Sequence, residues 1–311
     1  MSCDDGYIPY LAATLTSIKK NRDEKREYAV RILFTQISEE YIDRIVSFYS
    51  EEGFEVEFHN ISYAMEDILP KLHTRDYYSK TTYYRIFIPR LFSELDKALY
   101  LDCDISVCSD ISEIYDTPLG DNLLAAITDA FVHKDETLSL YSKNRLGIDS
   151  KYYINAGIIL MNLSVMREVD FEATFLRLIS RVKFDVAQDQ DYLNALCNGR
   201  IVYLGAEWNV MPFFTELSGK SPKIVHYNLD NKPWQKDGVP FGDIFFSYAN
   251  ECAYAKEISK AAANKDPERT KKSIEETKEL VRLSLSEALD REENERIKNE
   301  INLCKKVIIR V

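Results

Sequence analysis

The segment that most constrains this chain is a short apolar run, residues 98–101, that ends in two carboxylates, Asp102 and Asp104. Such a run predicts a buried strand, and open α/β sheets bind their ligands where the strands end. In an extended segment, residues i and i+2 point to the same side, so both carboxylates can face one cation while Cys103 points the other way. Carboxylate ligands of this kind suit Mg²⁺ or Mn²⁺.

The Asp-x-Asp spacing alone is weak evidence, because the chain contains a second copy at Asp189 and Asp191. A solvated turn explains such a pair as well as a metal site does. The apolar run before Asp102 favours the metal site, because a turn that follows a buried strand is a more selective context than a surface loop.

Length and charge limit the class of protein. The 311 residues suffice for one large α/β domain with a tail, or for two modest domains. A net charge of −11 argues against nucleic acid as the main partner, because such binders carry a basic face. No window approaches the roughly 18 to 20 apolar residues of a membrane span, and the N-terminus lacks a signal-peptide pattern. We therefore expect a cytoplasmic protein, with peripheral attachment to the inner face of the membrane left open.

The six cysteines are spread along the chain without the C-x-x-C spacing of a zinc site. We expect them to be reduced thiols, used mostly in packing.

Strand-like and helix-like segments alternate in the first hundred residues. Residues 28–35 are β-rich, residues 38–50 have helical periodicity, and residues 56–58 resume a strand. This alternation predicts a parallel sheet with crossover helices. Residues 77–95 are expected to form a tyrosine-rich helix. The strand before the loop at Asp4 is expected to be very short or to begin upstream.

Several later segments combine an apolar run with polar residues at one end. The predicted strands are residues 123–127, 153–162, 201–204 and 224–226. A helix is expected from Asp189 to a stop at Gly199; helix capping explains one carboxylate of its first turn but does not explain Gln190.

Beyond about Pro267 the composition changes to charged helix formers. The apolar residues form two stripes at helical spacing: Ile274, Val281, Leu285 and Ala288, then Ile297, Ile301, Cys304 and Ile308. We predict a domain of residues 1–265 followed by a helical extension of residues 266–311. Attachment of this extension to a membrane surface is the weaker interpretation, because acidic residues are mixed through it.

Six motifs occur in the order seen in glycosyltransferase family 8. They are Asp4-Asp5-Gly6-Tyr7, Thr82-Tyr83-Tyr84-Arg85, Tyr100-Leu101-Asp102-Cys103-Asp104, Asn155-Ala156-Gly157, Gln188-Asp189-Gln190-Asp191, and His226 with Lys232-Pro233-Trp234. Over roughly residues 1–240 the chain resembles the bacterial members that transfer galactose or glucose from a UDP-sugar, and more distantly glycogenin.

The resemblance implies a GT-A fold, with a single Rossmann-like mixed sheet flanked by helices. It also implies a UDP-hexose donor, a glycan or glycolipid acceptor such as lipopolysaccharide or another cell-surface polysaccharide, and retention of configuration. Mn²⁺ is the usual metal of the family, and Mg²⁺ is the alternative.

The family's functional positions carry over by motif. Asp102, Asp104 and His226 resemble the metal ligands. Asp4, Gly6, Tyr7, Cys103 and Lys232 match positions that hold the nucleotide, with Lys232 at the diphosphate. The positions that line the donor sugar are matched by Arg85, Asp129, Asn155, Ala156, Gly157, Asp189 and Gln190. Four of these are the expected catalytic residues: Arg85, Asp129, Asp189 and Gln190.

The expected transfer reaction needs a divalent cation, a lysine and a polar group beside the donor sugar. Departing UDP develops negative charge on its β-phosphate, which a divalent cation and a lysine can stabilise. A covalent sugar intermediate needs a carboxylate nucleophile, and none is obvious in the sequence. We therefore expect same-face substitution, with Gln190 stabilising the cationic sugar and the leaving phosphate taking the acceptor's proton.

Two departures from the family pattern stand out. The family usually has glycine three residues after the metal histidine, where this chain has Leu229, and we expect this leucine to shift the loop or weaken the diphosphate contact. The family also usually has several strand residues before the Asp4 loop, so a chain that starts at Met1 is expected to have low stability.

Other functions remain open at this point. A nucleotidyltransferase would normally carry a glycine-rich phosphate loop near its start, which the Asp4 loop is not. A catalytically inactive UDP-sugar-binding or scaffold protein is the other alternative. The sequence does not decide between galactose and glucose, or the oligomeric state, and residues 213–220 with the tail are the expected acceptor surface.

Overall fold

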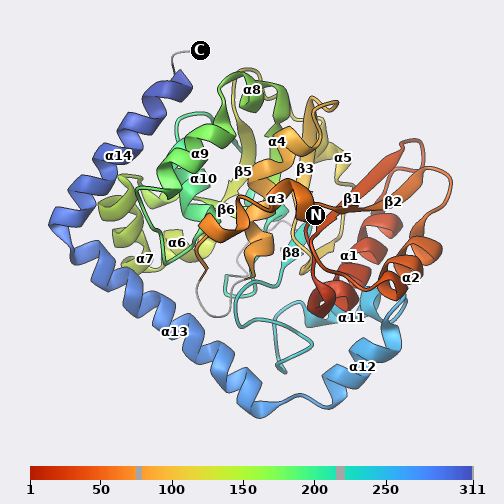
Figure 1. Cartoon of the computed structure of the whole chain (residues 1–311). Helices are drawn as coiled ribbons and strands as arrows, with labels where there is room; N and C mark the ends of the chain where they lie inside the picture. Colours follow the sequence, from red (N-terminus) through yellow and green to blue (C-terminus); the bar gives the residue numbers. More distant parts are fainter. Residues whose placement is uncertain (75–78, 215–220, 310–311) are drawn as a thin grey trace. The chain divides into compact units, whose positions relative to one another are not determined.

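The computed structural model describes residues 1–74, 79–214 and 221–309 (Figure 1). They divide into two compact units, each assembled from separate stretches of sequence. Unit 1 contains Met1–Glu66, Leu101–Asp116 and Ala206–Thr277. Unit 2 contains Asp67–Tyr100, Thr117–Gly205 and Lys278–Val311.

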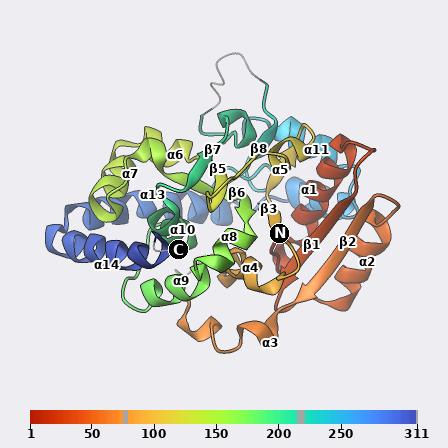
Figure 2. The ribbon, with the colours of Figure 1, turned by 90° about the horizontal axis from the view of Figure 1, so that it is seen from above.

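Unit 1 begins with the predicted β-α-β crossover. Strands β1 (Tyr28–Phe34) and β2 (Phe54–Asn60) pair in parallel over their whole length, which confirms the parallel arrangement. Helix α2 (Glu39–Tyr49) connects them and packs on β2, as Figure 2 shows. The turn into β2 uses Gly53 at φ 77°, a left-handed conformation that glycine adopts without strain.

The residues before the Asp4 loop pair with β1 through a single bridge. Ser2 forms one parallel bridge with Leu33, through hydrogen bonds of 3.0 Å from Cys3 N to Leu33 O and 2.9 Å from Leu33 N to Met1 O. A 3₁₀ turn, Asp5–Tyr7, then leads into helix α1 (Ile8–Asn21), which is buried along most of its length.

The remaining elements of unit 1 surround α1. Strand β4 (Ile105–Val107) pairs antiparallel with β8 (Ile224–His226), and α1 packs against β4, α2, α11 and α12. The helices here are α3 (Ser62–Met65), α5 (Ser112–Tyr115), the 3₁₀ turn Ala206–Trp208, α11 (Gly242–Ala249), α12 (Ala255–Ala263) and the first part of α13 (Pro267–Leu289).

Unit 2 is built on a mixed sheet of order β3-β6-β5-β7. Its strands are β3 (Lys97–Leu101), β5 (Leu124–Thr128), β6 (Ile154–Asn162) and β7 (Ile201–Tyr203). Strand β5 runs antiparallel to β6 and parallel to β7. Strand β6 is buried from Ile154 to Met161, so it is the centre of this core. The α/β class with a mixed sheet flanked by helices is confirmed, although in the described residues the strands divide into this four-stranded sheet and the two pairs β1-β2 and β4-β8 instead of forming the single sheet expected.

The helices of unit 2 are mostly short. They are η2 (Leu69–Lys71), η3 (Lys80–Phe87), α4 (Ile88–Leu91), α6 (Ala130–Lys134), α7 (Glu136–Tyr141), the π-helical turn η4 (Ser142–Leu146), η5 (Ser150–Tyr152), α8 (Leu163–Glu168), α9 (Phe171–Ile179), α10 (Asp189–Cys197) and α14 (Arg291–Ile309).

The predicted single helix over residues 77–95 is wrong in detail. The chain forms the 3₁₀ helix η3 and then one α-helical turn, α4, while residues 77 and 78 lie outside the described residues. Pro89 has no N–H and cannot make the α-helical bond to Arg85 O. Ile88 N makes the shorter i to i−3 bond to Arg85 O instead.

The predicted helical C-terminal part is confirmed, but one of its buried faces differs from the prediction. Helix α14 buries Ile297, Ile301, Cys304 and Ile308 as expected and packs on α9 and α10. In α13 the buried residues are Leu280, Ser284 and Ala288, whereas Leu285 is 43% exposed. Polar contacts fix this face: Asn144 donates to Ala288 O (3.0 Å) and Arg145 pairs with Glu287 (3.2 Å). The domain boundary at residue 265 stays a prediction.

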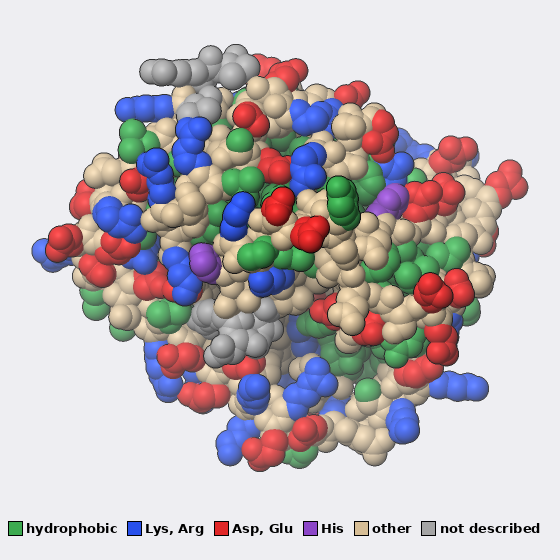
Figure 3. Space-filling view, viewed as in Figure 1, with side chains coloured by type: hydrophobic (Ala, Val, Ile, Leu, Met, Phe, Trp, Pro, Cys, Tyr) green, Lys and Arg blue, Asp and Glu red, His purple; other side chains and the backbone are tan. Residues whose placement is uncertain are grey.

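The surface shows mixed charge. On the face drawn in Figure 3, acidic and basic side chains of the described residues are interspersed over the whole view. Among these residues, no helix has both the length and the apolar character that a membrane crossing requires. All six cysteines are free thiols, and all except Cys108 are buried, as the sequence predicted.

A buried carboxylate holds several elements of unit 2 together. Asp191 in α10 is fully buried and accepts hydrogen bonds from Tyr153 OH (2.6 Å), Tyr141 OH (2.9 Å) and Ala187 N (2.9 Å). Burial raises the pKa of Asp191 to about 6, although these three hydrogen bonds favour its ionised form.

This pKa predicts a pH-dependent stability. The ordinary pKa of 3.8 rises to about 6 on folding, so the native state binds this proton more tightly than the unfolded state. The contribution of Asp191 to the free energy of unfolding is therefore full below about pH 4 and is lost as pH rises through about 6, a change of about 3 kcal/mol.

The measurement is urea unfolding of the wild type and Asp191→Asn between about pH 4 and 7.5. The difference in unfolding free energy, wild type minus variant, should fall by about 2–3 kcal/mol across this range. Parallel pH curves for the two proteins would contradict the assignment.

Candidate active site

The bend that carries Asp102 and Asp104 is fixed from beneath by helix α1. It lies between β3 and β4, and the buried Thr14 hydroxyl contacts the carbonyl oxygens on both sides of Asp104, at 2.9 Å from Cys103 O and 2.8 Å from Ile105 O. The Cys103 thiol turns to the interior and donates to Ser2 O at 3.1 Å. The two carboxylates point together and away from the thiol, as the sequence predicted.

Strand pairing brings His226 to these carboxylates. In the β4–β8 ladder Ile105 lies directly opposite His226, and Tyr227 N donates to Asp104 O at 2.9 Å. The register of this short ladder therefore determines where the imidazole lies.

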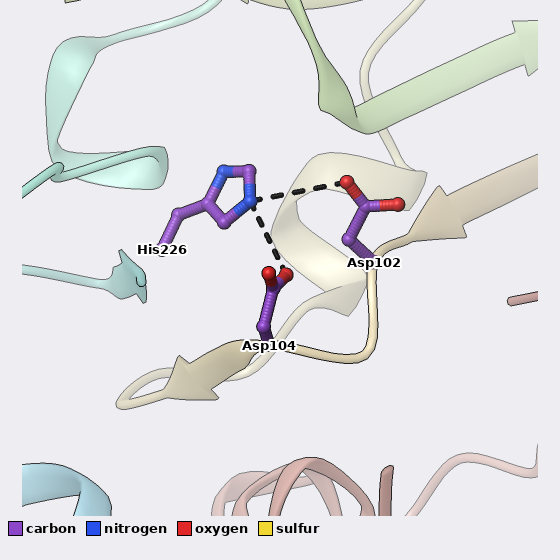
Figure 4. A group of neighbouring side chains, drawn as sticks. All are labelled: Asp102, Asp104 and His226. Atoms are coloured by element: carbon purple, nitrogen blue, oxygen red, sulfur yellow. Dashed lines mark ion pairs between the residues drawn. The ribbon is translucent and has the colours of Figure 1, made fainter. Parts of the chain in front are cut away.

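Asp102, Asp104 and His226 form a compact group of possible metal ligands (Figure 4). His226 Nε2 lies 3.3 Å from Asp104 Oδ1 and 3.8 Å from Asp102 Oδ2, and one ligand atom from each residue lies within 4.8 Å of the others. Such separations suit atoms that share one ion at about 2.0–2.3 Å each. Two carboxylates and one imidazole are a donor set that Mn²⁺ accepts well, so these residues fit a divalent cation.

Asn209 holds the imidazole in the orientation that a ligand needs. His226 Nδ1 donates to Asn209 Oδ1 at 3.0 Å, and both side chains are buried. The other ring nitrogen, Nε2, faces the carboxylates, where it can ligate a cation. No sequence signal pointed to Asn209, because a single asparagine seventeen residues before the histidine belongs to no readable motif.

Lys232 joins the same group. Its ammonium contacts the Asp104 carboxylate and Tyr227 O, and the side chain is buried. Burial disfavours the charged forms, but the attraction between the partners wins: the pKa of Lys232 is raised and that of Asp104 is lowered from their ordinary values.

The N-terminal loop belongs to unit 1 as well. A Cβ added to Gly6 would lie 3.3 Å from Asp4 Oδ1, so glycine permits the close approach of the carboxylate. The Tyr7 ring is 37% exposed and packs edge-on against Tyr10, which stacks on Trp234 with ring centroids 3.9 Å apart. An exposed ring on a rigid aromatic base is a suitable surface for stacking a nucleobase.

Gln190 is the centre of a second group, which lies in unit 2. Its Oε1 accepts hydrogen bonds from Ala156 N (2.9 Å) and Asn155 Nδ2 (3.2 Å), and its Nε2 donates to Asp129 Oδ2 (3.1 Å). Asn155 Nδ2 also donates to Asp129 Oδ2 (3.0 Å), and Asn155 Oδ1 accepts from Gly157 N (3.0 Å). These bonds fix the orientation of the Gln190 carboxamide.

Asp129 and Asp189 have partners for their charge. Asp129 Oδ1 caps helix α6 by accepting from Phe131 N (2.9 Å) and Val132 N (3.0 Å). Asp189 pairs with the buried Arg85 at 3.1 Å, and the Arg85 guanidinium also contacts Ala156 O. The expected cap at the start of α10 is not formed by the residue before the helix, because Gln188 makes no side-chain cap, and the Asp189 carboxylate pairs with Arg85.

The structure thus gathers the predicted site residues into two groups. In unit 1 they are Asp4, Gly6, Tyr7, Asp102, Cys103, Asp104, His226 and Lys232; in unit 2 they are Arg85, Asp129, Asn155, Ala156, Gly157, Asp189 and Gln190. The predicted acceptor surface at 213–220 lies outside the described residues from residue 215 onward.

Comparison with known proteins decides the family. The model of glycosyl transferase family 8 matches residues 1–238. The chain belongs to this family. A putative glycosyltransferase of Haemophilus influenzae is 30% identical over 250 residues, which cover 76% of this chain and 72% of that protein. The lipopolysaccharide 1,2-glucosyltransferase of Escherichia coli K12 is 25% identical, over 75% of this chain and 71% of its own.

Solved structures agree with the family assignment. The galactosyltransferase LgtC, in complex with donor and acceptor sugar analogues, is 25% identical with a TM-score of 0.66, over 81% of this chain and 94% of its own. The bifunctional glycosyltransferase WbbM is 28% identical with a TM-score of 0.74; the match covers 85% of this chain and about half, 51%, of the WbbM chain. The predicted GT-A fold is confirmed.

Leu229 occupies the position where family 8 usually has glycine, and its backbone is strained. Its φ is 52°, in the left-handed region that glycine adopts freely and other residues adopt at a cost of about 1–2 kcal/mol. The loop therefore has a glycine-type conformation in spite of the leucine side chain.

Two substitutions of Leu229 test this strain. We expect Leu229→Ile to lower the free energy of unfolding by about 1 kcal/mol, because a β-branched side chain fits the left-handed region poorly. We expect Leu229→Gly to stay within about 0.5 kcal/mol of the wild type, because strain relief offsets the lost contacts. Urea unfolding measures both, with Leu285→Ile on helix α13 as the control. An isoleucine variant as stable as the glycine variant would disprove the strained conformation.

The Asn209–His226 bond predicts a second effect. Asn209→Ala should weaken Mn²⁺ binding by about 10- to 100-fold, because the imidazole loses the partner that orients it. Calorimetric titration with MnCl₂ measures the affinity, and Asn264→Ala, at an exposed asparagine of the same unit, is the control. Unchanged affinity in Asn209→Ala would show that Asn209 does not orient a metal ligand.

Proposed function

We propose that this family 8 glycosyltransferase transfers a hexose, galactose or glucose, from a UDP-sugar to a glycan or glycolipid acceptor, with retention of configuration. The observation that carries the proposal is the group of Asp102, Asp104 and His226 beside Lys232. This is a site for a divalent cation together with a diphosphate, as departure of UDP requires.

The unit 1 residues are proposed to bind the leaving group. Asp102, Asp104 and His226 would hold Mn²⁺, or Mg²⁺ as the alternative, which neutralises charge on the diphosphate when bound. Lys232 supplies a further positive charge for the β-phosphate. Asp4, Gly6 and Tyr7 are proposed to hold the uridine, with the exposed Tyr7 ring against the base. The nucleotide contact assigned to Cys103 is limited to its backbone, since its thiol is buried.

The unit 2 residues are proposed to bind and activate the donor sugar. The fixed Gln190 carboxamide presents partial negative charge from Oε1, which suits a cationic sugar in the transition state. Arg85, held by Asp189 and Ala156 O, and the Asn155–Asp129 pair would orient hydroxyl groups.

Same-face substitution is the proposed route to retention. A covalent route needs a carboxylate that can attack the sugar, and the acidic residues of this group already have partners. Asp129 accepts four hydrogen bonds, Asp189 pairs with Arg85, and Asp191 is buried with both oxygens engaged. This supports acceptance of the acceptor's proton by the leaving phosphate. A sugar ester trapped on Asp129 or Asp189 would contradict it.

We propose lipopolysaccharide or another cell-surface polysaccharide as the acceptor class, and the inner face of the membrane in the cytoplasm as the place of action. The relatives support this, since they include a lipopolysaccharide glucosyltransferase of Escherichia coli.

The test is UDP release from UDP-glucose and UDP-galactose, with and without MnCl₂. We expect Mn²⁺-dependent release from one donor in the wild type and a loss of about 100-fold or more in Asp104→Asn. Asp237→Asn, at an exposed aspartate of the same unit, should behave like the wild type. UDP binding without turnover of any donor or acceptor would favour the alternative, an inactive UDP-sugar-binding protein.

A further inference from the structure

The Asp104 carboxylate can pair with either of two cations, a divalent metal ion or the Lys232 ammonium. Asp104 is one of the three residues that can ligate a divalent ion, and its carboxylate is in direct contact with the Lys232 ammonium. An ion bound to Asp104 would therefore lie beside a buried lysine charge, and two neighbouring positive charges in a buried site repel strongly.

The Lys232 ammonium has contacts besides Asp104. It also contacts Tyr227 O, and it lies 5.6 Å from the Trp234 ring centroid and 6.0 Å from that of Tyr7. Aromatic faces attract an ammonium at these distances. The Lys232 ammonium can therefore move away from Asp104 and still stay beside Tyr227 O and the two aromatic rings, provided that an anion pairs with it.

We propose that Lys232 is an exchangeable counter-ion that couples cation binding to nucleotide binding. A divalent cation displaces the ammonium from Asp104, and the nucleotide diphosphate then receives it, so each ligand increases the affinity of the other. This inference rests on the proposed function, because it takes the diphosphate of the proposed donor as the anion.

The loop that carries Lys232 has unused hydrogen-bonding capacity. Among the described residues, the buried polar atoms Asn228 Oδ1, Asn231 Nδ2 and Trp234 Nε1 have no hydrogen-bond partner. Buried polar groups are normally paired, so these atoms are suited to receive a ligand group that reaches the loop. Two of these atoms are N–H donors, which suit phosphate oxygens.

The first experiment measures Mn²⁺ affinity without any nucleotide, by calorimetric titration with MnCl₂. Lys232→Met should bind Mn²⁺ about ten-fold more tightly than the wild type, because the competing charge is gone. Lys236→Met is the matched control: it removes a lysine of the same loop that pairs with Asp230 at 3.0 Å, and it should change the affinity less than about two-fold. If Lys232 acts only on phosphate, the wild type and Lys232→Met should bind Mn²⁺ with equal affinity, and that result would overturn the proposal.

The second experiment uses UDP as the probe of coupling. In the wild type, UDP should tighten Mn²⁺ binding more than it does in Lys232→Met, by about ten-fold. If Lys232→Met does not fold, crystals of the wild type with MnCl₂ alone and with MnCl₂ and UDP answer the question. The lysine nitrogen should leave Asp104 when Mn²⁺ binds and contact the diphosphate when UDP is present; a lysine that stays on Asp104 in both would disprove the exchange.

Failure of this proposal is separate from failure of the proposed function. Both experiments measure binding alone, whereas UDP release from UDP-hexoses measures transfer. Tighter Mn²⁺ binding in Lys232→Met with no transfer activity in the wild type would support the exchange and reject the enzyme. Transfer activity with unchanged Mn²⁺ affinity would support the enzyme and reject the exchange.

Discussion

The backbone pairing of β4 with β8 is the constraint on which the metal group depends. It joins residues more than a hundred positions apart, and it is only three residue pairs long. Because side chains alternate along a strand, a shift of one residue would turn the imidazole of His226 to the opposite face. Thr14, in α1, and the Tyr227 N–H, directly after β8, hold the neighbouring bend in place. Several weak local contacts thus fix one geometry.

Much of the fold was predictable because each element depended on a local pattern, whereas the proposed site residues beyond Asp102 and Asp104 came from the resemblance to the family. Buried strands gave continuous apolar runs, as in β5 and β6, and the carboxylates that follow β3 came from the same pattern. The register of strand pairing was not readable from the sequence. Asn209 as the partner of His226 was therefore found only in the structure, as was the contact of the predicted residue Lys232 with Asp104. The partner of Asp189 was not readable for the same reason: the start of a helix suggested a cap for one carboxylate, whereas Asp189 pairs with Arg85, which is distant in sequence.

The two groups of site residues differ in their physical character. The unit 1 group carries net charge in close contact, with two carboxylates, one lysine and one imidazole. The unit 2 group combines an ion pair, Arg85 with Asp189, with an amide network in which Gln190 and Asn155 are fixed by hydrogen bonds to backbone and to Asp129. A charged group responds to ions and to salt, while an amide network provides fixed orientation.

The way each unit is assembled from distant stretches has a consequence for biosynthesis. Unit 1 needs Met1–Glu66 together with Ala206–Thr277, and unit 2 needs Thr117–Gly205 together with Lys278–Val311. Neither core can close on the ribosome until most of the chain has been translated, so apolar strands such as β6 must wait for their partners. Nascent chains of this protein are therefore expected to depend on chaperones for longer than those of proteins whose domains are continuous in sequence.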